Sequence, residues 1–385
     1  RVLLQSADSF RKKRNEITEE VKILLSQKKD AKKKIQEAKD LPSTIKEIEK
    51  KAAPLKEKID YYLMRLPNIL HDSVPYGKDD SENEVIKEVG KKISRKDLPP
   101  HGELLEQHGW ADFERAAKVS GAGFYFLKGQ FALLDQALLR FAIDKLVKKG
   151  YTLIEPPVLM NKKSYEGVTD LADFENVMYK IEGEDLYLIA TSEHPIGAMY
   201  KDEILKEEQL PIKFVGLSPC FRKEIGKHGI DTRGIFRVHQ FNKIEQFIFS
   251  TPEQSWKLHE ELLKNAEEIF KELGLAYRVV NICTGDIGIV AAKKYDMDVW
   301  MPREEKYREV VSNSNCTTYQ AVRSNIKFRK KDGSKEYVHT LNSTAIATSR
   351  ALRAILETYY DNGVIKIPKA LQPYMNGAKE ITPEN

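Results

Sequence analysis

One alternating run of charged and apolar residues constrains the fold of this chain more than any other feature. Between Gly234 and Phe247, the two-residue period of a β-strand puts five side chains on one face: Arg237, His239, Phe241, Lys243 and Glu245. A shorter run before it places Arg222 and Glu224 on a common face. Because burying an unpaired charge is costly, we predict two strands that present a charged surface to a ligand.

The residue types on this surface suit a nucleotide. Arginines bind phosphates, often through paired hydrogen bonds, an aromatic ring stacks on a base, and carboxylates accept from amino groups or bind a metal ion. The alternative is a solvated edge hairpin with exposed ion pairs. That alternative is disfavoured because Phe241, Phe247 and Phe249 share the charged face.

Composition limits the class of protein but not its function. The chain has 385 residues, of which 31% are charged, and a mean hydropathy of -0.50, which predicts a soluble protein of two or three domains. Since no run of about 18 apolar residues occurs, we expect no membrane span. Residue 1 is Arg1, so we expect the native N-terminus to be absent or processed.

The three cysteines of the chain are far apart: Cys220, Cys283 and Cys316. No Cys-x-x-Cys spacing occurs, so we expect buried thiols in a reducing, cytoplasmic setting and no disulfide framework. A zinc site of two cysteines and a glutamate is a formal alternative to ordinary packing.

Residues 1–66 are predicted to form an antiparallel helical hairpin. Apolar positions recur at coiled-coil spacing in two stretches: Ile17, Val21, Leu24, Lys28, Ala31, Ile35 and Ala38, then Ile45, Ile48, Ala52, Leu55, Ile59, Tyr62 and Leu66. The sequence Asp40-Leu-Pro-Ser43 is expected to break the helix, with Ser43 or Thr44 as the cap of the second arm. Lys28 and Pro54 depart from the pattern, so we expect a kink or weak packing there.

The basic excess of the chain lies on this hairpin. Residues 1–66 contain 18 Lys and Arg against 11 Asp and Glu, a net charge of +7, whereas the whole chain carries +5. Such an arm is either a solvated surface or a phosphate-binding device.

The rest of the chain alternates strands and helices. Residues 67–98 are expected to be a linker. Residues 131–149 have helical apolar spacing and stop at Gly150, before a strand at 151–155 and Pro156. A strand is expected at 185–191, before Thr191-Ser-Glu193. The sequence Leu341-Asn-Ser-Thr-Ala345 predicts a strand that leads through Thr348-Ser-Arg350 into a helix.

Several of these segments together resemble a known family. Phe221-Arg222-Lys-Glu224, a loop, then Arg237 and Phe241 are similar to motif 2 of the class II aminoacyl-tRNA synthetases. The helix and strand of residues 131–157 resemble motif 1, and residues 341–350 resemble motif 3. The wording of residues 234–247 resembles seryl-tRNA synthetases in particular, more closely the archaeal and eukaryotic cytosolic forms than the bacterial ones.

The resemblance implies the fold and the domains. It implies an α+β protein, with an antiparallel-sheet class II catalytic domain and an N-terminal antiparallel helical hairpin, or coiled coil. The expected boundaries are 1–66 for a tRNA-binding hairpin, 67–98 for the linker, 99–376 for the catalytic domain and 377–385 for a C-terminal tail. Motif 1 forms the dimer interface in that family, so a homodimer is implied.

The resemblance also implies the residues of the site. Catalytic roles fall to Arg222, Glu309 and Arg350. The residues implied for ATP are Arg222, Glu224, Arg237, Val238, Phe241, Glu309, Val310, Val311, Ser312 and Arg350. Those implied for L-serine are Thr191, Glu193, Arg222, Glu245, Asn342 and Thr344. Glu309 and Ser312 are the implied Mg²⁺ ligands, and a helix cap is the alternative role of Thr191 or Ser192.

The implied activity is ATP-dependent attachment of L-serine to serine tRNA through a seryl-adenylate. Serine tRNA would bind by its long variable arm to the basic hairpin, and selenocysteine tRNA would also be charged with serine where it exists. Two alternatives stay open: another class II synthetase, threonyl or prolyl, and a paralogue that activates an amino acid without tRNA. The hairpin argues against a carrier-protein ligase, which has no need of it.

Overall fold

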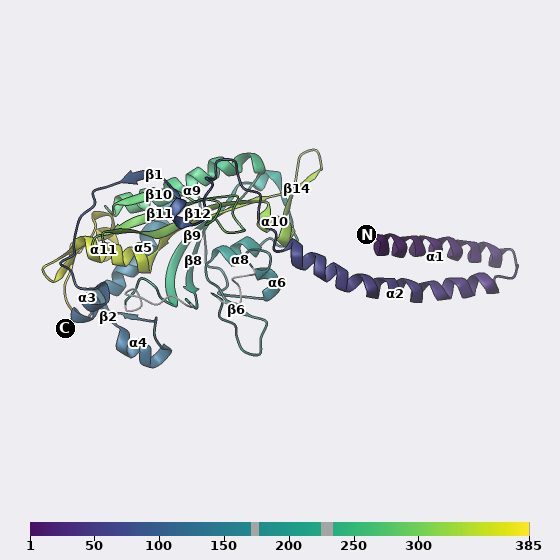
Figure 1. Cartoon of the computed structure of the whole chain (residues 1–385), viewed down its shortest axis with the longest axis horizontal. Helices are drawn as coiled ribbons and strands as arrows, with labels where there is room; N and C mark the ends of the chain where they lie inside the picture. Colours follow the sequence, from purple (N-terminus) through teal and green to yellow (C-terminus); the bar gives the residue numbers. More distant parts are fainter. Residues whose placement is uncertain (171–176, 225–233, 385) are drawn as a thin grey trace. The chain divides into compact units, whose positions relative to one another are not determined.

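The computed structural model describes residues 1–170, 177–224 and 234–384. The chain divides into two compact units, Arg1–Leu66 and Pro67–Asn385, which Figure 1 colours along the sequence. Within the described ranges, no helix combines the length and the apolar character that a membrane crossing requires. The loop 225–233, which separates the two predicted strands of motif 2, lies outside the described residues.

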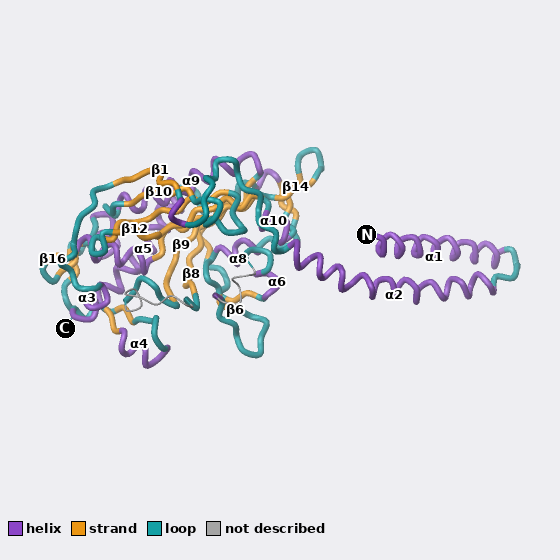
Figure 2. Tube along the Cα trace, in the orientation of Figure 1, coloured by secondary structure: helices purple, strands orange, loops and turns teal. Residues whose placement is uncertain are grey.

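The first unit is a hairpin of two long helices, α1 (Val2–Ser26) and α2 (Lys32–Leu63). The two helices lie side by side and run antiparallel, as Figure 2 shows in purple. Ion pairs between the helices fix this register, because Lys13 meets Glu37 at 2.8 Å and Lys34 meets Glu20 at 2.6 Å. The buried residues of the hairpin are few: Ala7, Ile17, Ala31, Leu41 and Ile45.

The predicted break of this hairpin was wrong. The chain turns at Gln27–Ala31, where Lys28 has a φ of 54° and the Asp30 carboxylate accepts from the backbone N–H of Lys32. Residues 40–43 continue α2, and both Pro42 and Pro54 lie inside it. Burial of Leu41 and Ile45 beside Pro42, worth about 1.5–3 kcal/mol each, offsets the roughly 3 kcal/mol that a proline costs within a helix.

The second unit is built on an eight-stranded sheet in the order β1-β10-β11-β12-β15-β9-β8-β4. Only β4 and β8 pair in parallel, and every other neighbouring pair is antiparallel. The strands are β1 (Glu84–Val89), β4 (Thr152–Ile154), β8 (Ile212–Phe221), β9 (Gln240–Ser250), β10 (Tyr277–Asn281), β11 (Lys293–Met301), β12 (Lys306–Thr317) and β15 (His339–Ala347). The predicted α+β class with an antiparallel sheet is confirmed.

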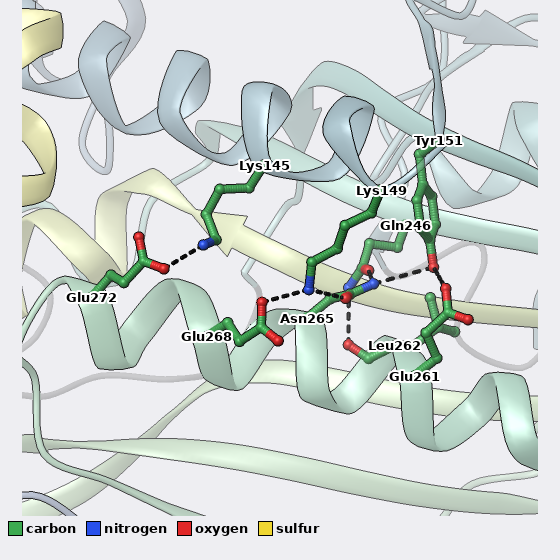
Figure 3. Close-up of polar contacts among 9 residues, drawn as sticks. All are labelled: Lys145, Lys149, Tyr151, Gln246, Glu261, Leu262, Asn265, Glu268 and Glu272. Atoms are coloured by element: carbon green, nitrogen blue, oxygen red, sulfur yellow. Dashed lines mark hydrogen bonds and ion pairs between the residues drawn. The ribbon is translucent and has the colours of Figure 1, made fainter.

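Three helices cover one face of this sheet: α5 (Gly129–Lys148), α9 (Pro252–Glu272) and α11 (Thr348–Tyr359). Their apolar faces join the sheet in one continuous core that includes Phe131, Phe270 and Leu352. Side chains at the C-terminal end of α5 form polar contacts with α9, as Figure 3 shows. Lys149 donates to Glu268 at 2.5 Å and to Asn265 at 2.8 Å, so the motif 1 helix predicted from the sequence is held on the sheet.

Shorter elements complete this unit. The helices are α3 (His101–Gln107), α4 (Phe113–Ser120), α6 (Lys162–Tyr165), α8 (Glu193–Ala198) and α10 (Tyr319–Ser324), with 3₁₀ turns at Asp80–Glu82, Glu207–Gln209 and Lys369–Met375. The remaining strands are β2 (Ala111–Asp112), β3 (Phe126–Leu127), β5 (Leu159–Met160), β6 (Tyr187–Leu188), β7 (Ile204–Lys206), β13 (Lys327–Arg329), β14 (Lys335–Tyr337), β16 (Tyr360–Asp361), β17 (Val364–Lys366) and β18 (Glu380–Ile381).

Two segments expected to be a linker and a tail contribute to this unit. The stretch 67–98 contains β1, which pairs with β10 at one edge of the main sheet. The stretch 377–385 contains β18, and beyond it the Glu384 carboxylate accepts from the backbone N–H of Gln130 at 2.8 Å, at the start of α5.

The charged strand predicted between Gly234 and Phe247 begins later than expected. β9 begins at Gln240, and residues 234–239 lead into it without regular strand structure. Other segments take up their backbone groups, since the N–H of Ile235 donates to His101 Nε2 and that of His239 to the carbonyl of Gly123. The strand expected at 185–191 is likewise reduced to β6.

Candidate active site

A small polar pocket of about 50 Å³ opens where β8, β9, β12 and β15 meet the start of α11. It is lined by Arg222, Glu224, Phe236, Val238, Phe241, Lys243, Glu309, Val310, Thr344, Ala347, Ser349 and Arg350. These residues come from four separate stretches of the chain. The sheet register brings them together, because Lys243 pairs with Ala347 and Glu245 with Thr344.

The pocket unites most of the residues that the sequence predicted for ATP. Its lining includes Arg222, Glu224, Val238, Phe241, Glu309, Val310 and Arg350. It also includes Thr344, which was predicted for serine. The segments that resemble motif 2 and motif 3 therefore meet at one place, together with Glu309 and Val310 of β12.

Two arginines that line the pocket each lie over an aromatic ring. The guanidinium carbon of Arg222 is 5.3 Å from the centre of the Phe241 ring, and that of Arg350 is 5.2 Å from the centre of Phe236. Arg350 Nη1 donates to the backbone carbonyl of Glu309 at 2.6 Å. Aromatic rings and guanidinium groups are the side chains that stack on a base and bind phosphates.

A buried ion pair forms the floor. Lys243 Nζ lies 2.6 Å from Glu245 Oε2, and the same oxygen accepts from the Thr344 hydroxyl at 3.3 Å. Both charged side chains are over nine-tenths buried. Burial raises the pKa of Glu245, while Lys243 opposes the rise. Such a buried pair is costly unless each polar atom is satisfied, and its place at the floor suits a small polar ligand.

A second carboxylate lies beside the floor. Glu193 Oε1 accepts from Asn342 Nδ2 and Gln320 Nε2, both at 3.1 Å. Burial, and then the nearby Glu245, raise the pKa of Glu193 to about 7. Thr191 Oγ1 accepts from the Glu193 N–H at 3.2 Å, although the N-cap of α8 is Ser192, whose side chain makes no capping bond.

A glycine lets this turn approach the sheet. A Cβ atom on Gly216 of β8 would lie only 2.6 Å from the Ser192 hydroxyl. Gly216 is the β8 partner of Glu245. The absent side chain therefore brings the turn that carries Glu193 close to the floor of the pocket.

Seven predicted site residues are not among those that line the pocket: Thr191, Glu193, Glu245 and Asn342 of the serine set, and Arg237, Val311 and Ser312 of the ATP set. Val311 is fully buried in the main apolar core, and Ser312 is partly buried opposite Asp296. A bulge in β12 beside Met297 and Asp298 inserts Val310 and so changes which side chains face the site. Arg237 is partly buried in the irregular stretch before β9.

Of the three aromatic rings predicted on the charged face, only one lies at the pocket. Phe241 lines the pocket, but Phe247 and Phe249 are fully buried in a separate apolar cluster with Ile196 and Phe328. The charged face of β9 thus becomes core toward its far end, which the alternating pattern alone does not reveal.

Sequence reasoning missed several residues of the site: Phe236, Lys243, Ala347, Ser349 and Gln320. Lys243 was visible on the charged face between Phe241 and Glu245, but no role was assigned to it. Ala347 and Ser349 lie within residues 341–350, which resemble motif 3, but no role was assigned to them. Nothing in the sequence around Gln320 indicated a bond to Glu193.

The donor set near Glu309 suits a hard cation only in part. Glu309 lies opposite Asp298 in the sheet, and Ser312 lies opposite Asp296, whose Oδ1 is buried without a hydrogen-bond partner among the described residues. Oxygen donors are the ones that Mg²⁺ prefers. In the described ranges, however, no three His, Cys, Asp or Glu side chains are grouped as a metal site, so phosphate oxygens would have to supply further ligands.

The surroundings of the cysteines bear on the alternative of a zinc site of two cysteines and a glutamate. Within the part of the chain that the structure describes, the three cysteines are free, buried and not grouped with other metal-binding side chains. Cys316 instead contacts Asn342, whose amide nitrogen lies 3.5 Å from the sulfur.

Known proteins resemble this chain along its whole length. The family model of the seryl-tRNA synthetase N-terminal domain matches residues 1–70, and that of the tRNA synthetase class II core domain (G, H, P, S and T) matches residues 177–359. The serine–tRNA ligase of Methanocella arvoryzae is 62% identical over 385 residues, which cover 99% of this chain and 91% of that relative.

Solved structures agree. Seryl-tRNA synthetase from Pyrococcus horikoshii complexed with ATP superposes with a TM-score of 0.90 at 50% identity, over 100% of this chain and 91% of that one. The cytoplasmic serine–tRNA ligase of Naegleria fowleri in complex with AMP gives 0.85 at 34% identity, over 100% and 90%. Together with the motif 2 and motif 3 residues around one pocket, these similarities establish that the chain belongs to the seryl-tRNA synthetase family.

Proposed function

We propose that the chain attaches L-serine to serine tRNA in two steps. A carboxylate oxygen of serine attacks the α-phosphorus of ATP, the bond to the bridging oxygen breaks, and diphosphate leaves. A ribose hydroxyl at the 3′ end of the tRNA then attacks the seryl carbonyl, and AMP leaves. The observation that carries the proposal is the juxtaposition of Arg222 and Arg350 with the buried Lys243–Glu245 floor in one pocket.

ATP occupies the outer part of the pocket in this proposal. Phe241 stacks under adenine and Glu224 accepts from its amino group. Arg237, Val238, Val310, Val311 and Ser312 belong to the same proposed set, although Val311 would act through the backbone because its side chain lies in the core. Arg222 clamps the α-phosphate and the serine carboxylate, two anions that repel each other in water, and Arg350 binds the terminal phosphates.

L-serine occupies the inner part. Its ammonium group meets Glu193, Thr191 and Glu245, and its hydroxyl meets Glu245 and Thr344, with Asn342 holding Glu193 in place. A site built to bond a hydroxyl rejects the analogue that lacks it by about 10⁴-fold. Alanine is therefore excluded because it leaves these hydrogen-bonding groups unpaired, whereas threonine must be excluded sterically.

Mg²⁺ is part of the proposal through Glu309 and Ser312. When bound, the cation would neutralise charge on the β- and γ-phosphates. The oxygen donors of this corner fit it once phosphate oxygens complete the coordination. Glu309, half exposed at the rim and 3.7 Å from Arg350, then serves to orient the polyphosphate end of the nucleotide.

The hairpin is the proposed binding surface for tRNA. Its net charge of +7 is spread over two long, mostly exposed helices. A-form RNA hides its base edges in a deep groove, so a basic helical arm reads shape and backbone. The long variable arm of serine tRNA, and of selenocysteine tRNA where present, is the proposed ligand.

A cytoplasmic homodimer is also proposed. Apolar side chains are exposed along the motif 1 segment: Leu133 (55%), Val147 (46%) and Leu153 (40%). β4, which carries Leu153, is the last strand of its sheet, and an open strand edge is a ready pairing surface. A second copy of the chain would cover both features.

Aminoacylation tests this function. Purified protein, ATP, Mg²⁺ and radiolabelled serine are incubated with transcripts of a serine tRNA and of a threonine tRNA. We expect labelled ester on the serine tRNA alone, which also separates this reading from the threonyl alternative. A protein that forms the adenylate but charges neither transcript would instead be a paralogue that works without tRNA.

A further inference from the structure

Phe236, one of the pocket residues that the sequence did not single out, contacts two guanidinium groups. The carbon of the Arg350 guanidinium is 5.2 Å from the ring centre, and that of Arg353 is 4.7 Å from it. Both arginines belong to α11, one helical turn apart. Phe236 is 5% exposed and lines the pocket, so the ring joins a surface cation to a buried one.

Arg353 is 1% exposed and bonded to acids from two elements. Its Nε donates to Glu357 of the same helix at 2.8 Å, and its Nη2 is paired with Glu304 in the turn between β11 and β12. Glu357 also accepts from the backbone N–H of Arg303 at 2.9 Å. Arg353 therefore ties the motif 3 helix to that turn.

Glu304 extends the connection toward the rim of the pocket. Its second oxygen pairs with Arg308, at 2.8 Å from Nε and 2.6 Å from Nη2. Burial alone would raise the pKa of Glu304, but bonds from Arg353 and Arg308 outweigh it and lower the pKa. Arg308 is the neighbour of Glu309, so one carboxylate links the strand of Glu309 to the helix of Arg350.

Stability does not explain such a network well. Replacing a buried ion pair by apolar residues of similar size is often neutral or stabilising. A buried, fully bonded cation beneath a pocket wall has a different effect, because it gives the wall one fixed position. That position matters for a site that works by orientation and not by a nucleophilic side chain.

We propose that Arg353 is a positioning residue for the nucleotide end of the pocket, fixing Arg350 through Phe236 and Glu309 through Glu304 and Arg308. The inference rests on the proposed function, since it assumes that Arg350 and Glu309 hold the phosphates of ATP. It extends that function to four residues without an assigned role: Phe236, Glu304, Arg308 and Arg353.

The proposal separates the two substrates. Glu193 and Glu245, at the serine end, are bonded to Asn342, Gln320, Lys243 and Thr344, none of which belongs to the Arg353 network. Changes that loosen the network should therefore weaken the binding of ATP and leave the binding of serine unchanged. A purely structural role would lower thermal stability without such a distinction.

The primary variant is Phe236→Leu, which removes the ring and leaves every ion pair in place. ATP affinity is measured directly by calorimetry, and the KM values for ATP and serine by ATP–pyrophosphate exchange. Since a cation–π contact is worth about 0.5–2 kcal/mol, we expect the Kd and the KM for ATP to rise about 2- to 30-fold, and by more than the serine KM, which should stay within about twofold. Phe236→Tyr keeps the ring and should recover most of the ATP affinity.

A second variant acts on the buried cation. Arg353→Met combined with Glu357→Gln avoids leaving a bare carboxylate, and we expect the same selective loss of ATP affinity. The matched control is Lys149→Met, which breaks the α5–α9 ion pair of Figure 3 and should change the Tm alone. Variants with a lower Tm but unchanged ATP affinity would overturn the proposal.

Different results would contradict the proposed function and the positioning role of Arg353. Wild-type protein that binds ATP but shows no exchange with serine would contradict the proposed function. The calorimetric comparison of wild type with Phe236→Leu would still decide the role of the network. Equal weakening of ATP and serine would also count against a role confined to the nucleotide end.

Discussion

At the scale of single residues, the inner end of the pocket works by charge balance. Burial, and then the nearby Glu245, raise the pKa of Glu193, and Lys243 forms a buried ion pair with Glu245. An arriving ammonium group adds the second positive charge. Serine binding and the ionisation of Glu193 are therefore coupled.

This coupling predicts a pH dependence. With its pKa raised to about 7, Glu193 is mostly protonated at pH 6 and mostly ionised at pH 8. We expect serine affinity, measured by calorimetry, to rise roughly tenfold over that range. Glu193→Gln should bind more weakly with a flat profile, while Glu268→Gln on the surface of α9 should keep the wild-type profile. A wild-type profile that falls with pH would contradict this assignment.

The same shift has a defined effect on stability. The folded-state pKa of Glu193 is raised above its usual value of 4.5. Its contribution to the free energy of unfolding is therefore complete below about pH 4.5 and is lost as the pH rises through about 7. Glu193→Gln should remove this loss, which chemical denaturation at pH 5 and pH 8 would detect.

Single residues also mark the limit of what the sequence could predict here. Arg222, Phe241, Glu309 and Arg350 lie in motifs and were found from the sequence, and the structure brings them together. Gln320 and Phe236 were not found, because their roles depend on contacts with residues over 100 positions away. A pattern of local spacing carries no record of such contacts.

At the scale of elements, the hairpin shows how packing overrides local signals. Pro42 predicted a break, but α2 continues through it because Leu41 and Ile45 are buried beside it. The true turn depends on Lys28 with positive φ and on the Asp30 cap, both weak signals in a lysine-rich stretch. Helix α5, whose apolar period is strong and free of proline, was predicted nearly to its ends, and α11 was predicted to follow the strand at 341–345, with no end assigned.

Pro42 should therefore store a local cost. Pro42→Ala restores a backbone N–H and removes a ring clash, worth up to about 3 kcal/mol. We expect amide hydrogen exchange around residues 38–46 to slow, by up to about 100-fold. Pro252→Ala is the control, since Pro252 occupies the first turn of α9, where its N–H is not needed. Unchanged protection at 38–46 would show that the helix already tolerates Pro42 without strain.

At the scale of the whole molecule, the pocket and the basic surface belong to different units of the chain. The pocket lies wholly within the second unit, whereas the basic excess lies on the first. Amino-acid activation should therefore be independent of the hairpin, and tRNA charging should depend on it.

Charge removal at the hairpin turn tests this division. Lys28, Lys29, Lys32 and Lys33 are exposed, and their joint replacement by Gln should lower kcat/KM for serine tRNA at least tenfold and flatten its salt dependence. Exchange without tRNA should stay within about twofold. A control with Lys331, Lys335, Lys369 and Lys379 replaced by Gln removes equal charge from the second unit. Equal loss in both quadruple variants would point to bulk charge in place of a specific arm.

The most direct test of the central claim is ATP–pyrophosphate exchange by wild-type protein with Mg²⁺ and no tRNA, run separately with serine, threonine, proline and alanine. We predict exchange with serine, with alanine reduced by about 10⁴-fold because it leaves the buried hydroxyl partners unpaired. Exchange driven by threonine or proline in preference to serine would contradict the assignment of the inner pocket.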